Sequence, residues 1–382
     1  MISDLFPYLS DIIFADKKPE EVESQLITTY ENLTGRSLAR GDPVRLFLEA
    51  ITLMMIHQRA LIDHSAKMNL LAYAKDYYLD HIGALLGVTR LEASHALTTL
   101  KFTLSEIQDS AIIIPEGTRA TPGGGDILFA TVESVEIPAG ETEISVTAQC
   151  TVTGEIGNGY IEGQIKRLVD PFPYEMTVIN TTTSYGGSDV ENDENFRERI
   201  QLAPESFSTA GSIGAYEFFA RSAHSDIIDV AIIGPAESDT VPPGHVYVYP
   251  LMTGGVLPTQ EILDAVFEIC NSEDKRPDTD FLHVVSPEIV SYNLNVKYWI
   301  DRKRATQATQ IQLAVSNAVQ DWITWQKTKL GRDINPSELN HRMIAAGAKR
   351  TEIISPDFQI LELWQVAVEN EVNVILGGLE DG

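Results

Sequence analysis

The chain has 382 residues, enough for roughly two to four domains of ordinary size. Its hydrophobic fraction of 43% excludes a largely disordered chain, and its formal net charge of -27 argues against sequence-independent binding to nucleic acid or to an anionic membrane surface. Protein partners and small ligands remain as binding classes.

The two cysteines, Cys150 and Cys270, lie far apart, and neither belongs to a CxxC or a metal-binding pattern. The sequence therefore predicts no disulfide framework and no zinc site. The first residues carry no basic segment before an apolar run, and no stretch reaches the ~18 apolar residues of a membrane-spanning helix. We expect folding in a reducing cytoplasm.

Residues 1–95 are predicted to be helical. Between Val44 and Leu71, apolar residues and two histidines recur at spacings of four and three on one helical face, as in a coiled-coil seam. His57 and His64 lie on the same stripe and are interpreted as packed side chains rather than metal ligands. The helix either closes a small core of its own or joins a bundle shared with another chain. The seam consists of Leu46, Ala50, Leu53, Leu61, Met68 and Leu71.

Residues 96–187 predict an all-β module, a sandwich or a small barrel, because short alternating segments are separated by Pro/Gly turns. Strands are predicted within 97–104, 111–118, 126–132, 141–148 and 160–168. The glycines at 123–125 and within 154–163 are interpreted as turns, since neither cluster has the sequence context of a phosphate-binding loop.

The remainder mixes helical and strand patterns and predicts two tandem α+β sandwiches, at 188–290 and 291–382. The predicted fold class is therefore multidomain α+β, with an N-terminal helical region, an inserted all-β module and two small α+β domains. Helices are expected at 193–202, 212–223, 259–271, 306–328 and 335–348, and strands at 227–233, 245–251, within 282–300 and at 371–378.

The most charged segment begins at Asp193 and predicts a helix with Phe196 on its buried face. Arg197 follows Asp193 by four residues and Glu194 by three, so surface pairs worth a few tenths of a kcal/mol are expected. These charges are interpreted as structural, because nothing indicates that they line a cleft.

Gly211-Ser212-Ile213-Gly214 resembles a hydrolase nucleophile elbow only in part. It lacks the glycine two residues before the serine, and the preceding segment is not a strand. Ser212 is better interpreted as the N-cap of the helix that carries Tyr216. No zinc-protease, Walker or EF-hand pattern occurs. We therefore expect no enzyme activity, no catalytic residue, no cofactor and no metal.

Several of these segments resemble the baseplate J family, in its Mu-like branch, whose members are wedge proteins of contractile phage tails. The run at 193–200, Ala-Gly-Ser at 210–212, and the residues at 215–216 and 221–223 resemble the family signature. Segments at 129–165, 271–300 and 330–354 resemble further family patterns, and "YLDHIGALLGVTR" at 78–90 is the most family-like part of the helical region. The signature residues are Asp193, Glu194, Phe196, Arg197, Arg199, Gly211, Ser212 and Tyr216.

The resemblance implies a structural role in the virion, at the tail baseplate, after assembly in the host cytoplasm. The implied partners are a second copy of the chain, a smaller tail wedge protein, a sheath-initiator-like wedge protein, the central hub and neighbouring wedges, with neither nucleic acid nor membrane. The implied action is to link wedges into a ring around the tail tube and to transmit the change that triggers sheath contraction.

Two other classes remain open. A receptor- or carbohydrate-binding tail protein would use exposed aromatic residues of the β module, such as Phe172 and Tyr174. A tail-associated hydrolase would hold a perturbed carboxylate or serine in a deep pocket.

Overall fold

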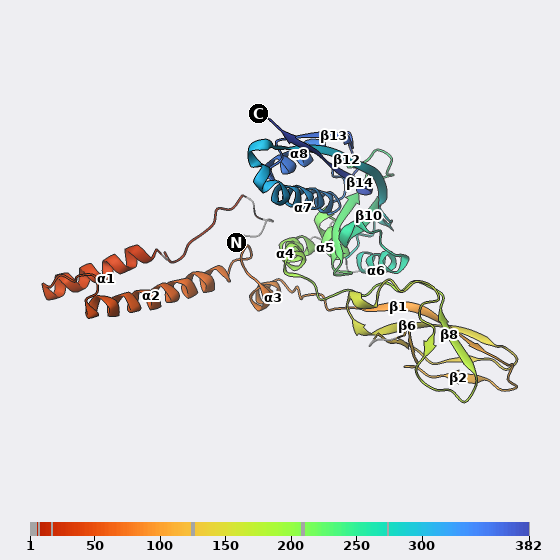
Figure 1. Ribbon diagram of the computed structural model, residues 1–382. Helices are drawn as coiled ribbons and strands as arrows, with labels where there is room; N and C mark the ends of the chain where they lie inside the picture. Colours follow the sequence, from red (N-terminus) through yellow and green to blue (C-terminus); the bar gives the residue numbers. More distant parts are fainter. Residues whose placement is uncertain are drawn as a thin grey trace. The chain divides into compact units, whose positions relative to one another are not determined.

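Figure 1 shows the computed structural model of the chain, which describes residues 6, 8–16, 18–123, 127–207, 211–272 and 275–381. The chain divides into two compact units, one of residues 1–90 with 193–201 and one of residues 91–192 with 202–382. Within the described ranges, no helix is long and apolar enough to cross a membrane. Among the residues discussed above, Gly124, Gly125, Asp126, Ala210, Glu273 and Asp274 lie outside those ranges.

The first unit is helical, as predicted. Its elements are α1 (Pro19–Thr34), α2 (Pro43–Lys67), α3 (Asp76–Leu85) and α4 (Asp193–Leu202). Helices α1 and α2 lie side by side as a hairpin (Figure 1). Gly35 ends α1 at a φ of 66°, and the Asp42 side chain begins α2 by accepting a hydrogen bond from the Val44 N–H at 2.9 Å. The sequence pattern of the long helix does not indicate that α1 is its neighbour.

The second unit begins with the predicted all-β module. Its strands are β1 (His95–Leu104), β2 (Ile112–Ile114), β3 (Arg119–Thr121), β4 (Phe129–Thr131), β5 (Val135–Ile137), β6 (Glu143–Thr153), β7 (Arg167–Leu168) and β8 (Met176–Asn180). Six of them form one antiparallel sheet in the order β7-β3-β4-β6-β1-β8, and β2 pairs with β5 in a second, two-stranded sheet. Every second residue of β1 is buried, which places one face of the large sheet against the core.

The strand predicted at 160–168 is mostly absent from the described structure, and the Asn180 side chain holds this segment in another conformation. Its buried side-chain oxygen accepts a hydrogen bond from the Ile165 N–H at 2.8 Å, and its amide group donates to the carbonyls of Tyr160, Ile161 and Thr182 at 2.9–3.2 Å. These bonds hold residues 160–165 as an irregular segment beside β8. Of the strand predicted at 160–168, only Arg167–Leu168 form one.

The next part is a small α+β sandwich. It consists of α5 (Ile213–Arg221), β9 (Ile227–Ile233), β10 (His245–Met252), α6 (Gln260–Cys270) and β11 (Phe281–Val284). The sheet order is β11-β10-β9, with β10 parallel to β11 and antiparallel to β9. Side chains of both helices share one buried cluster with the three strands, which include Val248 at 0% exposure.

The C-terminal part is a second α+β sandwich. It consists of β12 (Glu288–Asp301), α7 (Ala308–Gln326), α8 (Pro336–Ala345), β13 (Arg350–Ser355) and β14 (Gln365–Glu380). The central strand β12 pairs antiparallel with β13 and parallel with β14. Trp322 of α7 is fully buried in the core beneath this sheet. Together the parts confirm the predicted multidomain α+β fold class. Short 3-10 helices lie at Glu155–Gly157, Ala203–Phe207, Thr253–Gly255 and Arg302–Gln307.

Both cysteines are buried free thiols, so we expect neither to react with DTNB at pH 8 in the folded protein. Burial raises the pKa of the Cys270 thiol to about 12, which leaves only about 10⁻⁴ of it as the reactive thiolate at that pH. Two equivalents should react after unfolding in guanidinium chloride. Rapid native labelling that Cys270→Ala abolishes would contradict a closed core around this residue.

Candidate assembly surfaces and a candidate pocket

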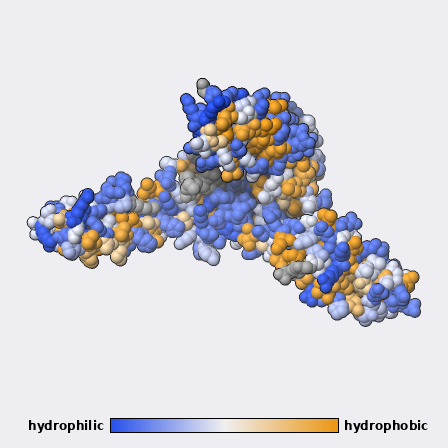
Figure 2. Space-filling view, in the orientation of Figure 1, coloured by the Kyte–Doolittle hydropathy of each residue, from blue (hydrophilic) through white to orange (hydrophobic). Residues whose placement is uncertain are grey.

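Helix α2 carries an exposed apolar stripe, which we call the α2 stripe and define by Leu46, Ala50, Leu53 and Leu61. The three leucines are 56%, 69% and 51% exposed, and Ala50 is exposed as well. His57 and His64 are exposed on the same side of the helix. Figure 2 shows hydrophobic residues at the surface over the α1 and α2 hairpin. The interface assignment of these residues stays a prediction.

The side of α2 that carries Thr52 and Asp63 packs against other parts of the first unit. Thr52 and Asp63 are buried there, and Asp63 accepts a hydrogen bond from the Phe14 N–H at 2.9 Å. Arg45 forms an ion pair with Glu23 of α1 at 2.9 Å. Because α1 and residues 12–16 cover this side, they leave the α2 stripe uncovered.

Three further apolar side chains widen the exposed surface of α2. Phe47, Met54 and Ile62 are 64%, 67% and 57% exposed. The single seam predicted from the sequence does not include these three residues. Phe47 and Met54 stand seven residues apart, as do Leu46 and Leu53, and Ile62 directly follows Leu61, so a second series beside the first was the signal that could have revealed these residues.

Met68 and Leu71 do not continue the exposed stripe. The helix ends at Lys67, and Met68 is buried in a small cluster with Phe6 and Tyr73. Leu71 is partly buried against the same cluster. This corrects the length of the predicted seam, because the chain turns after Lys67 and folds these two residues into the interior of the first unit.

Helix α4 holds the first part of the signature, and the structure corrects the interpretation of its charges. Phe196 is fully buried, as predicted, but Arg197 and Arg199 are also buried, at 1% and 4% exposure. Arg197 donates hydrogen bonds to the carbonyls of Leu71 and Ala74 at 2.8 and 2.6 Å, and its guanidinium lies 2.7 Å from the Glu194 carboxylate. The two arginines are therefore interior residues. Removing a buried, hydrogen-bonded guanidinium lowers the free energy of unfolding far more than removing a surface ion pair does.

The expected pair between Glu194 and Arg197 forms, whereas Asp193 has a different partner from the one predicted. Asp193 pairs with Arg90 at 2.8 Å rather than with Arg197, and Arg90 also binds Asp80 at 2.9 Å. The Arg199 guanidinium donates to the Thr89 carbonyl at 2.7 Å. Residues 78–90 and 193–200, the two segments of the first unit that resemble the family, thus contact each other.

Gly83 permits this close packing between α3 and α4. A Cβ atom at Gly83 would lie 2.6 Å from the Phe196 ring and 2.8 Å from the Val88 carbonyl oxygen. Sequence reasoning did not single out Gly83 or Arg90, although both lie inside the family-like segment 78–90.

The second part of the signature holds a turn in the second unit. Ser212 caps α5, as predicted, because its hydroxyl accepts a hydrogen bond from the Ala215 N–H at 3.3 Å. Gly211 has a φ of 69° and packs against Pro277 and Asp280. The Tyr216 hydroxyl donates to Asp280 at 2.8 Å, and burial together with this carboxylate raises the pKa of Tyr216. These contacts fix residues 277–280, the turn that leads into β11.

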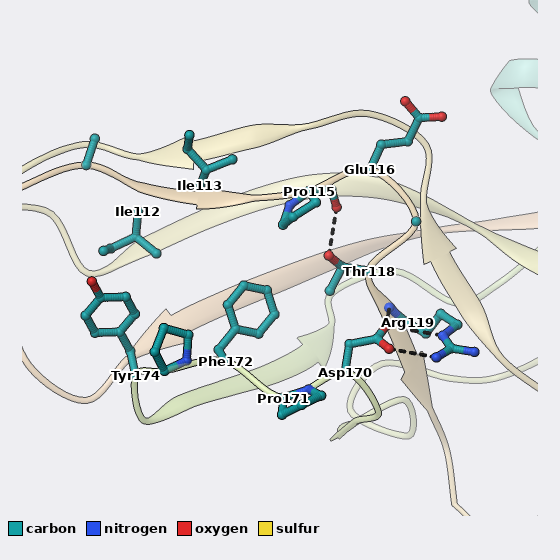
Figure 3. A pocket seen from close by; sticks show the side chains of 13 residues that line it. Ile112, Ile113, Pro115, Glu116, Thr118, Arg119, Asp170, Pro171, Phe172 and Tyr174 are labelled. Carbon is teal, nitrogen blue, oxygen red and sulfur yellow. Dashed lines mark hydrogen bonds and ion pairs between the residues drawn. The ribbon is translucent and has the colours of Figure 1, made fainter.

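One pocket of about 740 Å³ lies on the β module (Figure 3). Ile112 and Pro115 line one side, and the rings of Phe172 and Tyr174 face them. At the end away from Tyr174, Arg119 forms a bidentate pair with Asp170, at 2.7 and 3.2 Å. The carbohydrate-binding hypothesis relied on exposed aromatic residues here; Tyr174 is 38% exposed, whereas Phe172 is partly buried against the core of the module.

No group with the geometry of a catalytic centre emerges from the described residues. Ser212 acts as a helix cap, and the Arg119–Asp170 pair lowers the pKa of Asp170, so this carboxylate is held ionised and not poised as an acid. Within the described ranges, no cluster of three or more His, Cys, Asp or Glu could hold a metal ion. The expectation that the chain has neither catalytic nor metal-binding residues stays a prediction.

Comparison with known proteins assigns the family. Models of the baseplate J-like N-terminal, barrel, central and C-terminal domains match residues 41–96, 99–187, 208–286 and 292–375. Baseplate protein J of Escherichia phage P2 is 31% identical over 193 residues, which cover 50% of this chain and 61% of that relative's length. A chain of the anti-feeding prophage baseplate is similar over 92% of this chain and 90% of its own length, with a TM-score of 0.42 and 13% identity. Four domain models in consecutive order thus span most of the sequence, and the chain belongs to the baseplate J family.

Proposed function

We propose that this protein is a structural wedge subunit in the baseplate of a contractile phage tail. In this role it links neighbouring wedges into a ring around the tail tube and hub, and it transmits the conformational change that triggers sheath contraction. Family membership supports the baseplate setting. The proposed location is the virion, at the tail baseplate, after assembly in the host cytoplasm. The proposed role is structural rather than enzymatic.

The α2 stripe is the observation that carries this proposal. Single exposed leucines are common on protein surfaces, but a row of large apolar side chains about two helical turns apart, here at spacings of seven and eight residues, is typical of a helix that packs against other helices. Full burial of each leucine is worth about 1.5–3 kcal/mol, so three of them provide a substantial association energy. We propose that a second copy of this chain and a smaller tail wedge protein cover the stripe in a shared helical bundle.

Further partners follow from the same role. A sheath-initiator-like wedge protein, the central hub and the neighbouring wedges would contact other surfaces of the chain. The small α+β sandwiches offer interfaces of the moderate size that a ring needs if it is to rearrange.

Native mass spectrometry of the chain, alone and co-expressed with the product of the adjacent tail gene, tests the proposal. We expect a discrete complex of two copies with one partner. The double variant Leu53→Asp/Leu61→Asp should weaken this complex at least about 100-fold, because two charges would be buried in an apolar seam. Its thermal stability as an isolated chain should stay near that of the wild type, because both leucines are exposed there.

Leu33→Asp is the matched control. It makes the same chemical change at a leucine of α1 that is 82% exposed, and it should leave the complex intact. A chain that stays monomeric beside the co-expressed partner, or a complex that the two variants weaken equally, would refute the α2 stripe as the assembly surface.

A further inference from the structure

The pocket on the β module is lined in part by β2, a strand with one edge that is unpaired within the described residues. Within the described chain, β5 is the strand that pairs with β2, and no residue of β5 lines the pocket. In an antiparallel ladder, alternate residues direct their N–H and C=O groups to opposite sides. Part of the backbone donors and acceptors of β2 therefore point away from β5, and Ile112 and Ile113 of this strand line the pocket.

The wall of the pocket that faces Ile112 and Pro115 has little capacity to pair with a strand. Pro171 and Pro173 alternate with Phe172 and Tyr174, and proline has no N–H to donate to a neighbouring strand. The wall instead presents two aromatic rings toward Ile112 and Pro115 (Figure 3). The space between the edge and the wall thus combines backbone hydrogen-bonding groups with apolar and aromatic surface.

The charge of the pocket favours a basic occupant. Its charged lining residues are Glu116, Arg119 and Asp170, and the last two neutralise each other. Glu116 is exposed and extends away from this pair at the rim (Figure 3). The surrounding module, residues 96–187, contains 12 acidic and 4 basic residues, so its field attracts cations and repels phosphate-rich ligands.

We propose that this pocket binds a short extended peptide segment of a partner protein. The segment adds to the free edge of β2 and places an apolar or aromatic side chain between Ile112 and Tyr174. A lysine or arginine of the segment reaches Glu116. The three residues of β2 span about 10 Å, which sets a core of three to four peptide residues. This site is separate from the α2 stripe and does not depend on the proposed bundle.

Selection of a phage-displayed random heptapeptide library on the full-length chain tests the proposal. We expect enriched peptides in which apolar residues alternate with others and at least one lysine or arginine recurs. Tyr174→Ala should weaken binding of a selected synthetic peptide at least tenfold. Glu116→Arg should do the same and should reverse the preference, so that the peptide with glutamate in place of the basic residue binds better.

Two controls separate the parts of the proposal. Glu162→Arg makes the same charge change at an exposed residue outside the pocket and should leave peptide binding unchanged. Two N-methylated forms of the selected peptide, one methylated at its odd-numbered and one at its even-numbered residues, should differ in binding. Only one form should lose binding, because a strand pairs with its neighbour through the N–H groups of every second residue.

Three outcomes would overturn the proposal. One is enrichment on the wild-type chain that does not exceed enrichment on the Tyr174→Ala/Glu116→Arg variant. Another is that both N-methylated peptides bind as tightly as the unmodified peptide. The third is binding of neutral oligosaccharides on a glycan array that depends on Tyr174 while no peptide is selected, which would assign the pocket to carbohydrate.

Discussion

Replacing Arg197 with methionine should lower the free energy of unfolding of the first unit by about 3–5 kcal/mol. Methionine keeps much of the side-chain volume but removes the guanidinium, so the carbonyls of Leu71 and Ala74 lose buried hydrogen bonds of 2.8 and 2.6 Å. These bonds hold the chain that leads from α2 to α3 against α4. Chemical denaturation followed by circular dichroism, with the helical signal of the first unit as the readout, measures the loss.

Two variants separate the buried bonds from the surface charge. Arg197→Lys keeps the charge but cannot reach both carbonyls with a planar fork, so it should be nearly as destabilising. Glu194→Gln removes only the carboxylate partner, whose side chain is 64% exposed, and should cost less than about 1 kcal/mol. A loss of that small size for Arg197→Met as well would mean that Arg197 acts only as a surface pair, as the sequence had suggested.

Replacing Trp322 with alanine should destabilise the C-terminal sandwich by about 3–5 kcal/mol. The side chain is fully buried, and its ring meets the Tyr292 ring edge-on at a centroid distance of 5.7 Å. Alanine would leave a large cavity between α7 and β12, which the surrounding core cannot fill by relaxation. Hydrogen exchange by mass spectrometry should show faster exchange in β12 and β14, whereas the β module should keep its protection.

Trp322→Phe is the matched control for the shape of this core. Within the described structure, the indole N–H of Trp322 has no hydrogen-bond partner, so phenylalanine loses volume but no bond. Its cost should therefore be clearly smaller than that of alanine. If phenylalanine were as destabilising as alanine, the indole N–H would have to bind something, such as an ordered water.

The periodicity of the sequence was sufficient to predict those helices, strands and caps that depend on neighbouring residues in the chain. The long helix, the alternating strand at 95–104, the strand at 227–233 and the Ser212 cap all follow from spacing and capping chemistry that depend on near neighbours. The sequence also predicted the α2 stripe, because the spacing of apolar residues is a property of one helix. It did not predict whether another part of the chain covers the stripe, since that depends on where α1 and residues 12–16 pack.

Only the tertiary structure decided the features that join distant residues. Arg197 and Arg199 have the sequence pattern of surface helix charges, yet contacts with residues 71–74 and 89 bury them. Residues 160–165 form an irregular segment instead of the predicted strand, because the buried Asn180 amide bonds backbone groups of Ile161 and Ile165. Without this side chain, those groups would need the hydrogen bonds of a neighbouring strand.

The pocket on the β module has the same origin, since it brings residues 111–119 together with 170–174. The sequence thus determined the elements and, through its resemblance, the family of this protein. The fold decided which charges are buried and which strand edge stays open, because burial and hydrogen-bond partners depend on residues that lie far apart in the chain.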